Sequence, residues 1–222
     1  MQVLIDNRGA YLDGFIVTLW LLLFAGLIAA VLGTLLAAMR VSPVAIVRGA
    51  GTSYINVVRN TPLLLVLFLF RDAFPKLGFN YSINNYFDFF FIAGTAGLGL
   101  YAAAFVCEAL RSGINSIPVG QAEASRAIGM TFSQSMREII LPQALRAVVP
   151  PLASTYISLA KNTSVALAMG VTEASFQMKK LTNDNAPARW EIFFGFAAGY
   201  IVIVWTIALL ARLLERRWAR AR

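Results

Sequence analysis

Long apolar runs alternate with short polar segments along this chain. Five runs come close to the roughly 20 residues that a helix needs to cross the hydrocarbon core of a membrane. They cover residues 14–38, 52–70, 89–110, 148–171 and 192–214. The pattern predicts an all-α polytopic membrane protein with five transmembrane helices. The first run is too long for the hydrophobic region of a signal peptide, so we expect it to remain as a membrane span.

The second run is interrupted by a polar notch, Arg59-Asn60-Thr61-Pro62. Because proline has no N–H and displaces the preceding turn, Pro62 should free a backbone carbonyl there. The notch is therefore a candidate for contact with polar cargo. The alternative is a structural kink from which Arg59 reaches the cytoplasmic surface.

Small residues recur at every fourth position of the run at 89–110. They are Thr95, Gly99, Ala103 and Cys107, extended by Ala93 and Gly97. This spacing puts small side chains on one helix face, where another helix can approach closely, within the bundle or across a subunit interface. The glycines at 94–99 do not follow the order GxGxxG and lie at mid-membrane, so they are not a phosphate loop.

Composition agrees with a membrane protein, since 59% of the 222 residues are apolar and only 14% are charged. The net charge of +8 does not indicate a nucleic-acid partner, because Lys and Arg lie between apolar runs rather than in a patch with aromatic residues. With the N-terminus outside, the inner segments hold 11 cations and three acids, and the outer segments six cations and seven acids. The positive-inside rule therefore predicts an N-out, C-in orientation.

Several kinds of chemistry have no residues to support them. The chain has no His and one Cys, so a disulfide framework is excluded and a metal site has almost no ligands. It also lacks GxxxxGK[ST], so it cannot bind ATP through a P-loop of its own. We expect no metal, no cofactor and no catalytic residue in this chain.

A long polar segment, residues 112–147, separates the third and fourth runs and falls on the cytoplasmic side. Residues 121–128 have good helix propensity, and Gly129 should end that helix. Thr131 or Ser133 can cap a second helix, which Pro142 should break or kink.

The first of these helices has a small apolar face made by Ala124, Ala127 and Ile128. Such a face fits a shallow groove on a partner protein. The alternative is an ordinary amphipathic loop at the membrane surface.

The same segment carries a recognisable motif. Glu123-Ala124-Ser125, then three residues, Gly129, nine residues and Ile139-x-Leu141-Pro142, resembles the EAA pattern of ABC importer permeases, with Ser125 in place of the second Ala. The stretches 108–114, 117–121, 141–146 and 161–164 are similar to its polar amino-acid uptake branch. The stretches 40–43, 58–62 and 112–115 are most similar to actinobacterial-type glutamate permeases.

The resemblance implies a type I ABC importer transmembrane fold, a single permease domain over 1–222, in a bacterial plasma membrane. It implies that residues 112–147 dock on a cytoplasmic ATPase homodimer, which holds ATP and Mg²⁺. The residues carried over to this coupling role are Glu123, Ala124, Ser125, Ala127, Gly129, Leu141 and Pro142. Further implied partners are a second, different permease subunit, an extracytoplasmic substrate-binding protein, membrane lipid and an amino-acid substrate.

Three ionisable residues lie at membrane depth, Arg59, Glu108 and Lys161, where a charge costs about 2.5–3.5 kcal/mol on insertion scales. Glu108 can instead snorkel or pair with Arg111. Lys161, near the middle of the fourth run, needs an anion, which is either a protein acid or a substrate carboxylate.

The resemblance implies that a set of polar residues lines the translocation pathway. The set is Lys161, Asn162, Thr163, Ser164, Arg59, Asn60, Thr61 and Glu108. Many family members that take basic substrates have Asp at the position of Asn162, so the resemblance implies that a neutral Asn beside Lys161 favours an acidic amino acid such as glutamate. Basic or other polar amino acids remain the alternative substrates.

Two other functional classes fit less well. A secondary transporter would need paired repeats and more spans, and neither is evident. A membrane anchor or scaffold would explain the cytoplasmic segment but not the polar residues at 161–164. The sequence therefore favours a transport subunit rather than an enzyme.

Overall fold

The computed structural model describes residues 2–78 and 88–219, and this part of the chain is helical throughout, with no strand. The α-helices are α1 (Gln2–Asp6), α2 (Arg8–Arg40), α3 (Ala45–Arg59), α4 (Leu63–Lys76), α5 (Phe89–Asn115), α6 (Val119–Ala127), α7 (Phe132–Gln134), α8 (Leu141–Asn162), α9 (Ala174–Asp184) and α10 (Arg189–Ala219). A π-helical turn, η1 (Ser135–Ile140), and two 3₁₀ segments, η2 (Thr163–Met169) and η3 (Ala186–Ala188), join them.

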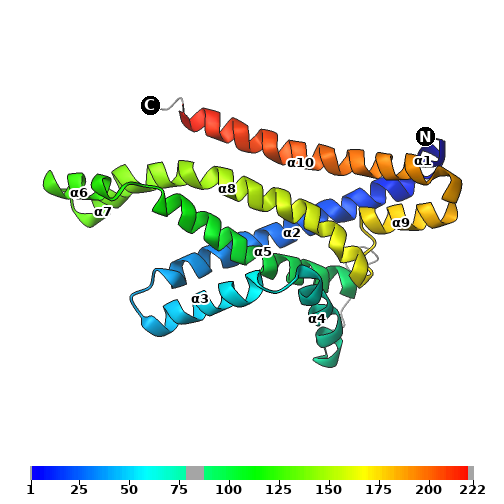
Figure 1. Cartoon of the computed structure of the whole chain (residues 1–222), viewed down its shortest axis with the longest axis horizontal. Helices are drawn as coiled ribbons and strands as arrows, with labels where there is room; N and C mark the ends of the chain where they lie inside the picture. Colours follow the sequence, from blue (N-terminus) through cyan, green and yellow to red (C-terminus); the bar gives the residue numbers. More distant parts are fainter. Residues whose placement is uncertain (1, 79–87, 220–222) are drawn as a thin grey trace.

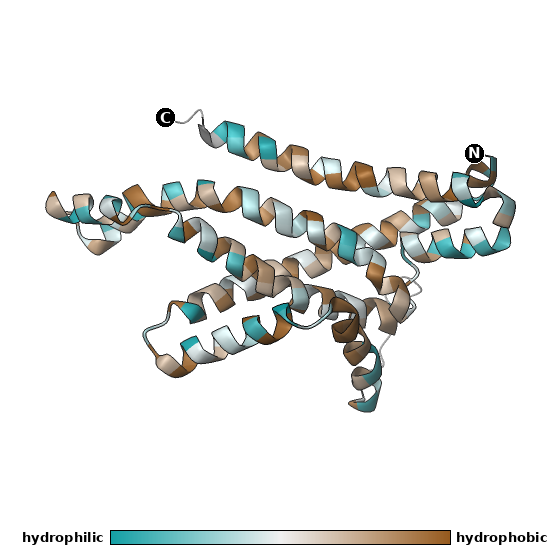
Figure 2. Ribbon diagram, in the orientation of Figure 1, coloured by the Kyte–Doolittle hydropathy of each residue, from teal (hydrophilic) through white to brown (hydrophobic). Residues whose placement is uncertain are grey.

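Four long helices, α2, α5, α8 and α10, extend roughly along the longest axis (Figure 1). Helix α5 crosses α2 and also packs against α8, and α8 packs against α10. The connection between α2 and α3, the α6–α7 segment and the C-terminal turns of α10 lie at one end, called the loop end below. The N-terminus and α9 lie at the other, called the α9 end. Figure 2 shows hydrophilic residues gathered in α9 and in the last turns of α10, with hydrophobic residues along the middle of α10.

The core forms where α5 packs against α2, because the small residues of α5 remove the side chains that would keep the helices apart. A Cβ atom at Gly99 would lie 2.7 Å from Ile28, and one at Gly33 of α2 would lie 2.6 Å from Val106. Ala103 and Cys107 are fully buried. The predicted small face is confirmed, and within this chain it packs inside the bundle.

The polar notch is a sharp corner. The chain bends by 104° between helices α3 and α4. The side chains of Asn60 and Thr61 donate to the carbonyl oxygens of Asn56 (2.7 Å) and Val57 (2.8 Å) at the end of α3. The Asn56 oxygen also accepts from the backbone N–H of Asn60 at 3.3 Å. Pro62 is the N-cap of α4, so the second apolar run forms two helices rather than one.

Membrane-crossing length and composition are met by α2, α5 and the stretch Ala186–Arg217, which contains most of α10. The bent pair α3–α4 raises the number to at most four in the described chain. Helix α8 is too polar to meet the same criterion. The helical, multi-pass character is confirmed, and the count of five stays a prediction.

The fourth run differs from the predicted continuous span over 148–171. Helix α8 begins earlier, at Leu141, and ends at Asn162, so Lys161 lies in its last turn and not near the middle of a helix. The hydroxyl groups of Thr163 and Ser164 each donate to the carbonyl oxygen three residues back, at 2.7 Å. Such local bonds favour the tighter 3₁₀ geometry, which continues to Met169.

The sequence predicts a break or a kink at Pro142, and no break occurs, because the chain stays helical from 132 to 162. Pro142 is the second residue of α8, and its missing N–H leaves one carbonyl oxygen of the preceding turn without its helical partner. In the π-helical turn η1 directly before it, backbone hydrogen bonds join residues five apart instead of four apart. Pro142 is thus accommodated by this local distortion rather than by a break.

At the α9 end, a buried carboxylate ties three helices together. Glu173 caps α9 by accepting from the backbone N–H groups of Ser175 and Phe176, both at 2.9 Å, and it accepts from the Tyr200 hydroxyl of α10 at 2.7 Å. The Thr18 hydroxyl of α2 accepts from the N–H of Ala174 at 3.1 Å. These bonds hold α9 against α2 and α10.

Candidate functional site

The polar segment folds as a helical hairpin at the loop end. Helix α6 starts after Pro118 and stops before Gly129, whose φ of 82° lies in the region that favours glycine. Thr131 then caps the next helix in a capping box with Gln134, so Thr131 and not Ser133 is the cap. The predicted helix, its glycine stop and its successor are confirmed.

Helix α6 presents different residues to its two sides. Glu123, Ala124 and Ala127 are exposed, and the Ile128 side chain that follows is 76% exposed. Ser125 is 1% exposed and faces the π-helical turn. The outward side is therefore a small apolar face beside one carboxylate.

Ser125 holds the hairpin closed. Its hydroxyl donates to the carbonyl oxygen of Ala122 at 2.9 Å and shares a hydrogen bond with the hydroxyl of Ser135 in η1. The motif residue Ser125 therefore contacts this chain itself. The sequence did not single out Ser135, because its pairing depends on how the hairpin closes.

A close helix crossing fixes the base of the hairpin. A Cβ atom at Gly113 of α5 would lie 2.2 Å from Val148 Cγ2 and 2.8 Å from the backbone nitrogen of Val148 in α8. The two helices that carry the hairpin can pack this tightly only because residue 113 is glycine. Leu141 and Pro142, the end of the motif, are exposed at the start of α8.

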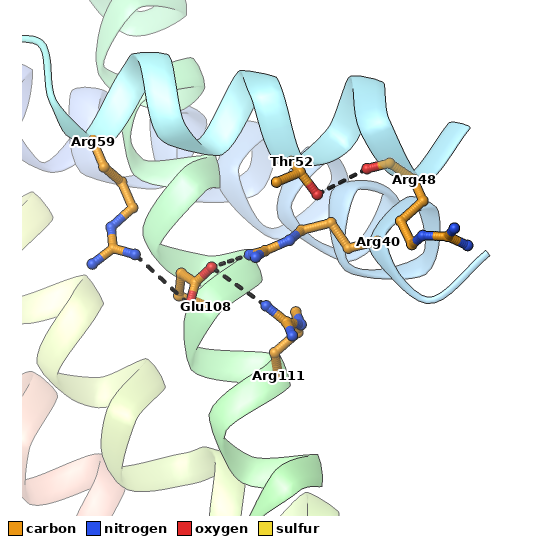
Figure 3. Close-up of polar contacts among 6 residues, drawn as sticks. All are labelled: Arg40, Arg48, Thr52, Arg59, Glu108 and Arg111. Atoms are coloured by element: carbon orange, nitrogen blue, oxygen red, sulfur yellow. Dashed lines mark hydrogen bonds and ion pairs between the residues drawn. The ribbon is translucent and has the colours of Figure 1, made fainter. Parts of the chain in front are cut away.

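Glu108 of α5 is the centre of an ion cluster that joins three helices (Figure 3). Its Oε1 atom pairs with Nη1 of Arg40, at the end of α2, and lies 3.8 Å from Nη1 of Arg111. Its Oε2 atom lies 3.7 Å from Nη1 of Arg59, at the end of α3. One carboxylate and three guanidinium groups leave a local charge of +2.

The cluster changes the interpretation of two predicted residues. Pairing of Glu108 with Arg111 is confirmed, and Arg40 was not predicted. The guanidinium of Arg59 turns to Glu108 and lies 5.9 Å from the centre of the Phe105 ring. The corner at 60–62 supports the interpretation as a structural kink. The side chains of Asn60 and Thr61 donate to backbone carbonyl groups of α3. Their donor groups are therefore engaged within the chain.

A cleft of about 390 Å³ lies between α5 and α8. Its lining residues are Tyr101, Ala102, Phe105, Ser154, Thr155, Ser158, Leu159 and Asn162. Phe105 thus borders both the cleft and Arg59. The lining offers hydroxyl groups and one amide, and it includes no carboxylate.

Of the predicted pathway residues 161–164, only Asn162 is among the residues that line this cleft. Lys161, the residue before Asn162, is exposed and is not part of the lining. Thr163 is fully buried with its hydroxyl bonded to Ala160, so it does not reach the cleft as predicted. In residues 2–78 and 88–219 no carboxylate lies within ion-pairing distance of Lys161.

Known proteins are similar to this chain over nearly its whole length. The glutamate transport system permease protein GluC of Corynebacterium efficiens is 43% identical over 217 residues, covering 95% of each chain. The glutamate/aspartate import permease protein GltJ of Escherichia coli K12 is 35% identical, covering 92% of this chain and 85% of that protein. A crystal structure of an amino acid ABC transporter with histidines matches with a TM-score of 0.85 at 30% identity, covering 96% of each chain.

The family comparison covers the same extent of sequence. Residues 15–220 match the family described as binding-protein-dependent transport system inner membrane component. The match includes the hairpin, the ion cluster and the cleft. This chain therefore belongs to the family of binding-protein-dependent transport system inner membrane components.

Proposed function

We propose that this chain is the permease subunit of an ATP-driven importer for acidic amino acids in a bacterial plasma membrane. One observation carries the proposal. Helix α6 exposes Glu123, Ala124 and Ala127 beyond the bundle and connects, through a continuous helical arm, to the residues beside the cleft. Since α8 has 22 residues, this arm is about 33 Å long and can transmit a movement of α6 to Lys161 and Asn162.

The topology that fits this function has five spans, with the N-terminus outside. The spans are α2, the bent pair α3–α4, α5, α8 with η2, and α10. The polarity of α8 is expected if one of its faces lines a wet cleft, because polar side chains at membrane depth are tolerated there. The arginine-rich loop end would then be cytoplasmic.

The proposed transporter requires further subunits. A separate ATPase, which holds ATP and Mg²⁺, would dock on residues 112–147 of the single permease domain, since this sequence has no P-loop. The cleft is formed by α5 and α8 alone, so a second permease chain is needed to enclose it. A different chain is supported by relatives with two permeases named for one import system, GltJ and GltK. A substrate-binding protein would deliver cargo at the α9 end.

The charge pattern favours an acidic substrate. Lys161 is exposed in the last turn of α8 without a carboxylate partner among the described residues, and Asn162, the next residue, contributes a neutral amide to the cleft. Arg59 lies behind Phe105 with part of its charge uncompensated. A basic amino acid would find no counter-ion in this lining, and the relatives named for glutamate agree with that choice.

The test is uptake by the assembled transporter in proteoliposomes. The permease, its ATPase and the second permease are reconstituted with the binding protein, and entry of labelled glutamate is followed with and without internal ATP. We expect uptake to need ATP and to be lost in Glu123→Arg, because reversing this exposed charge disrupts ATPase docking. Asp184→Arg, the same kind of reversal at the opposite end, should leave ATPase binding intact.

Other results would identify other classes. Uptake driven by a proton or sodium gradient without ATP would identify a secondary transporter. A stable complex that never moves an amino acid would support an anchor or scaffold. Uptake of arginine but not glutamate would support the assignment as a permease and contradict the assignment of an acidic substrate.

A further inference from the structure

A second hollow lies at the α9 end, far along the chain from the hairpin. It is a groove of about 650 Å³ between the end of η2, helix α9 and the first turns of α10. Its lining residues are Leu167, Ser175, Met178, Lys179, Thr182, Asn183, Arg189, Trp190 and Phe193. A smaller adjoining hollow shares Leu167, Lys179 and Asn183 with it and adds Phe176 and Lys180.

The lining of the groove combines polar and apolar side chains. Lys179 and Arg189 bring two positive charges, and the side-chain amide of Asn183 is a further donor. The hydroxyl of Thr182 donates within α9 to the carbonyl oxygen of Met178 at 2.7 Å. Leu167 and Phe193 are among the apolar lining residues. No carboxylate lines the groove, so an anion placed between the two cations meets no repulsion from the lining.

An aromatic group marks the level of this groove along α10. Trp190 and Phe194 are 63% and 65% exposed, and their ring centres lie 6.4 Å apart. The guanidinium of Arg189 lies 5.7 Å from the Trp190 ring centre. Exposed aromatic residues at the end of an apolar membrane helix are typical of the membrane–water interface, with hydrocarbon beyond them. A ligand in the groove would thus have its charged part at the headgroup level and its apolar part toward the exposed face of α10.

We propose that this groove binds an anionic phospholipid of the leaflet at the α9 end. Lys179 and Arg189 contact the phosphate, the side-chain amide of Asn183 donates to a headgroup oxygen, and an acyl chain lies along Phe193 and the apolar surface of α10. A basic pocket beside an apolar helix face has the charge and shape that such a lipid requires. The lipid would brace α9 against α10, two helices that also share the Glu173–Tyr200 hydrogen bond.

The experiment uses the purified full-length chain in an uncharged detergent. Dioleoylphosphatidylglycerol or dioleoylphosphatidylcholine is added, and bound lipid is counted by native mass spectrometry while thermal unfolding is recorded. We expect phosphatidylglycerol to bind and to raise the unfolding temperature, and phosphatidylcholine to do so much less. The double variant Lys179→Gln/Arg189→Gln should bind phosphatidylglycerol roughly 25-fold more weakly, since each interfacial cation contributes about fivefold.

Arg8→Gln is the matched control, because Arg8 is an exposed cation at the same end but outside the groove. It should bind phosphatidylglycerol like the unchanged chain. Both variants replace exposed residues, and their unfolding without lipid shows whether the fold is kept. Equal binding of both lipids, or an unchanged affinity in the double variant, would overturn the proposal. So would the same thermal shift with inorganic phosphate alone, or a cross-link from Thr182→Cys to the second permease.

Discussion

Asn162 and Lys161 set the charge at the end of α8. Asn162 lines the cleft, and Lys161 is the exposed residue directly before it in the last turn of α8. A carboxylate at position 162 would pair with Lys161 and repel an acidic substrate. Residue 162 is therefore the point at which one substitution should change which charge the cleft accepts.

Asn162→Asp should lower glutamate uptake at least about tenfold and raise uptake of arginine or lysine. Two charges about 4 Å apart interact by about 4 kcal/mol at an effective dielectric of 20, more than the 1.4 kcal/mol that corresponds to a tenfold change. Competition between labelled glutamate and arginine in proteoliposomes measures the effect. Asn56→Asp makes the same change on an exposed part of α3 and should leave the preference unaltered. An unchanged preference in Asn162→Asp would remove this residue from the pathway.

Glu108→Gln should destabilise the chain by about 1–3 kcal/mol, because three guanidinium groups lose the carboxylate that holds them together. Thermal unfolding in detergent is the measurement. The control is Glu138→Gln, which removes an exposed pair with Arg137 at 3.9 Å and should cost less than about 1 kcal/mol. Equal losses of stability in the two variants would show that the ion cluster stabilises the chain no more than an exposed ion pair does.

The sequence identified Glu108 and Arg59 as unusual but could not assign all their partners. Arg111 was predicted because it lies one turn away on the same helix. Arg40 is 68 residues away along the chain. It reaches Glu108 because the small residues of α5 let α2 approach, and this depends on three-dimensional packing.

At the scale of elements, the hairpin shows where local signals suffice. The stop at Gly129 and the cap at Thr131 follow from backbone conformation and short-range hydrogen bonds, which neighbouring residues determine. The end of α8 could not be predicted in this way. The apolar run continues past Asn162, and only the hydroxyl–carbonyl bonds of Thr163 and Ser164 show the change to 3₁₀ geometry.

Ser125 should tolerate alanine but not leucine. Ser125→Ala removes one hydroxyl from the contact with Ser135 and should cost no more than about 1.5 kcal/mol, with ATPase binding retained. Ser125→Leu overfills a buried position, should cost about 1–3 kcal/mol and should displace α6 enough to abolish ATPase binding. Co-purification of the ATPase and thermal unfolding report the two effects.

Ser133→Leu supplies the comparison, because the same enlargement at an exposed position of the hairpin should not change the fold of α6. If Ser125→Leu kept full ATPase binding, α6 would not depend on its packing against η1.

The connection before α9 should make stability depend on pH. Burial raises the pKa of Glu173 to about 7 from an ordinary value of 4.5. Because the folded chain then binds the proton more tightly than the unfolded chain, the stabilisation is complete below pH 4.5 and is lost as pH rises through about 7. Unfolding followed from pH 4.5 to 8 should show a loss on the order of 3 kcal/mol.

Glu173→Gln is the control, since an amide of the same shape cannot ionise. The difference between the two pH profiles removes the contribution of other carboxyl groups. Parallel profiles would mean that Glu173 keeps an ordinary pKa in the folded chain.

At the scale of the whole molecule, the arrangement fixes which segments share an end. The α2–α3 connection and the α6–α7 hairpin lie at the loop end, and α9 lies at the other (Figure 1). A cytoplasmic loop end satisfies the positive-inside rule, and it also agrees with the proposed docking of an ATPase on α6. Charge and coupling therefore support the same orientation from independent residues.

Cysteine labelling can test this topology because the single native thiol, Cys107, is buried. Single cysteines are introduced as Ser42→Cys, Ser133→Cys, Leu77→Cys and Asp184→Cys, and intact cells are treated with a membrane-impermeant maleimide. We expect residues 77 and 184 to react from outside, and residues 42 and 133 to react only after permeabilisation. Labelling at 133 and 184 from opposite sides would require α8 to cross the membrane despite its polarity. Labelling of 42 and 77 from the same side would instead make α3–α4 a re-entrant pair, leave four crossings and place the two termini on one side.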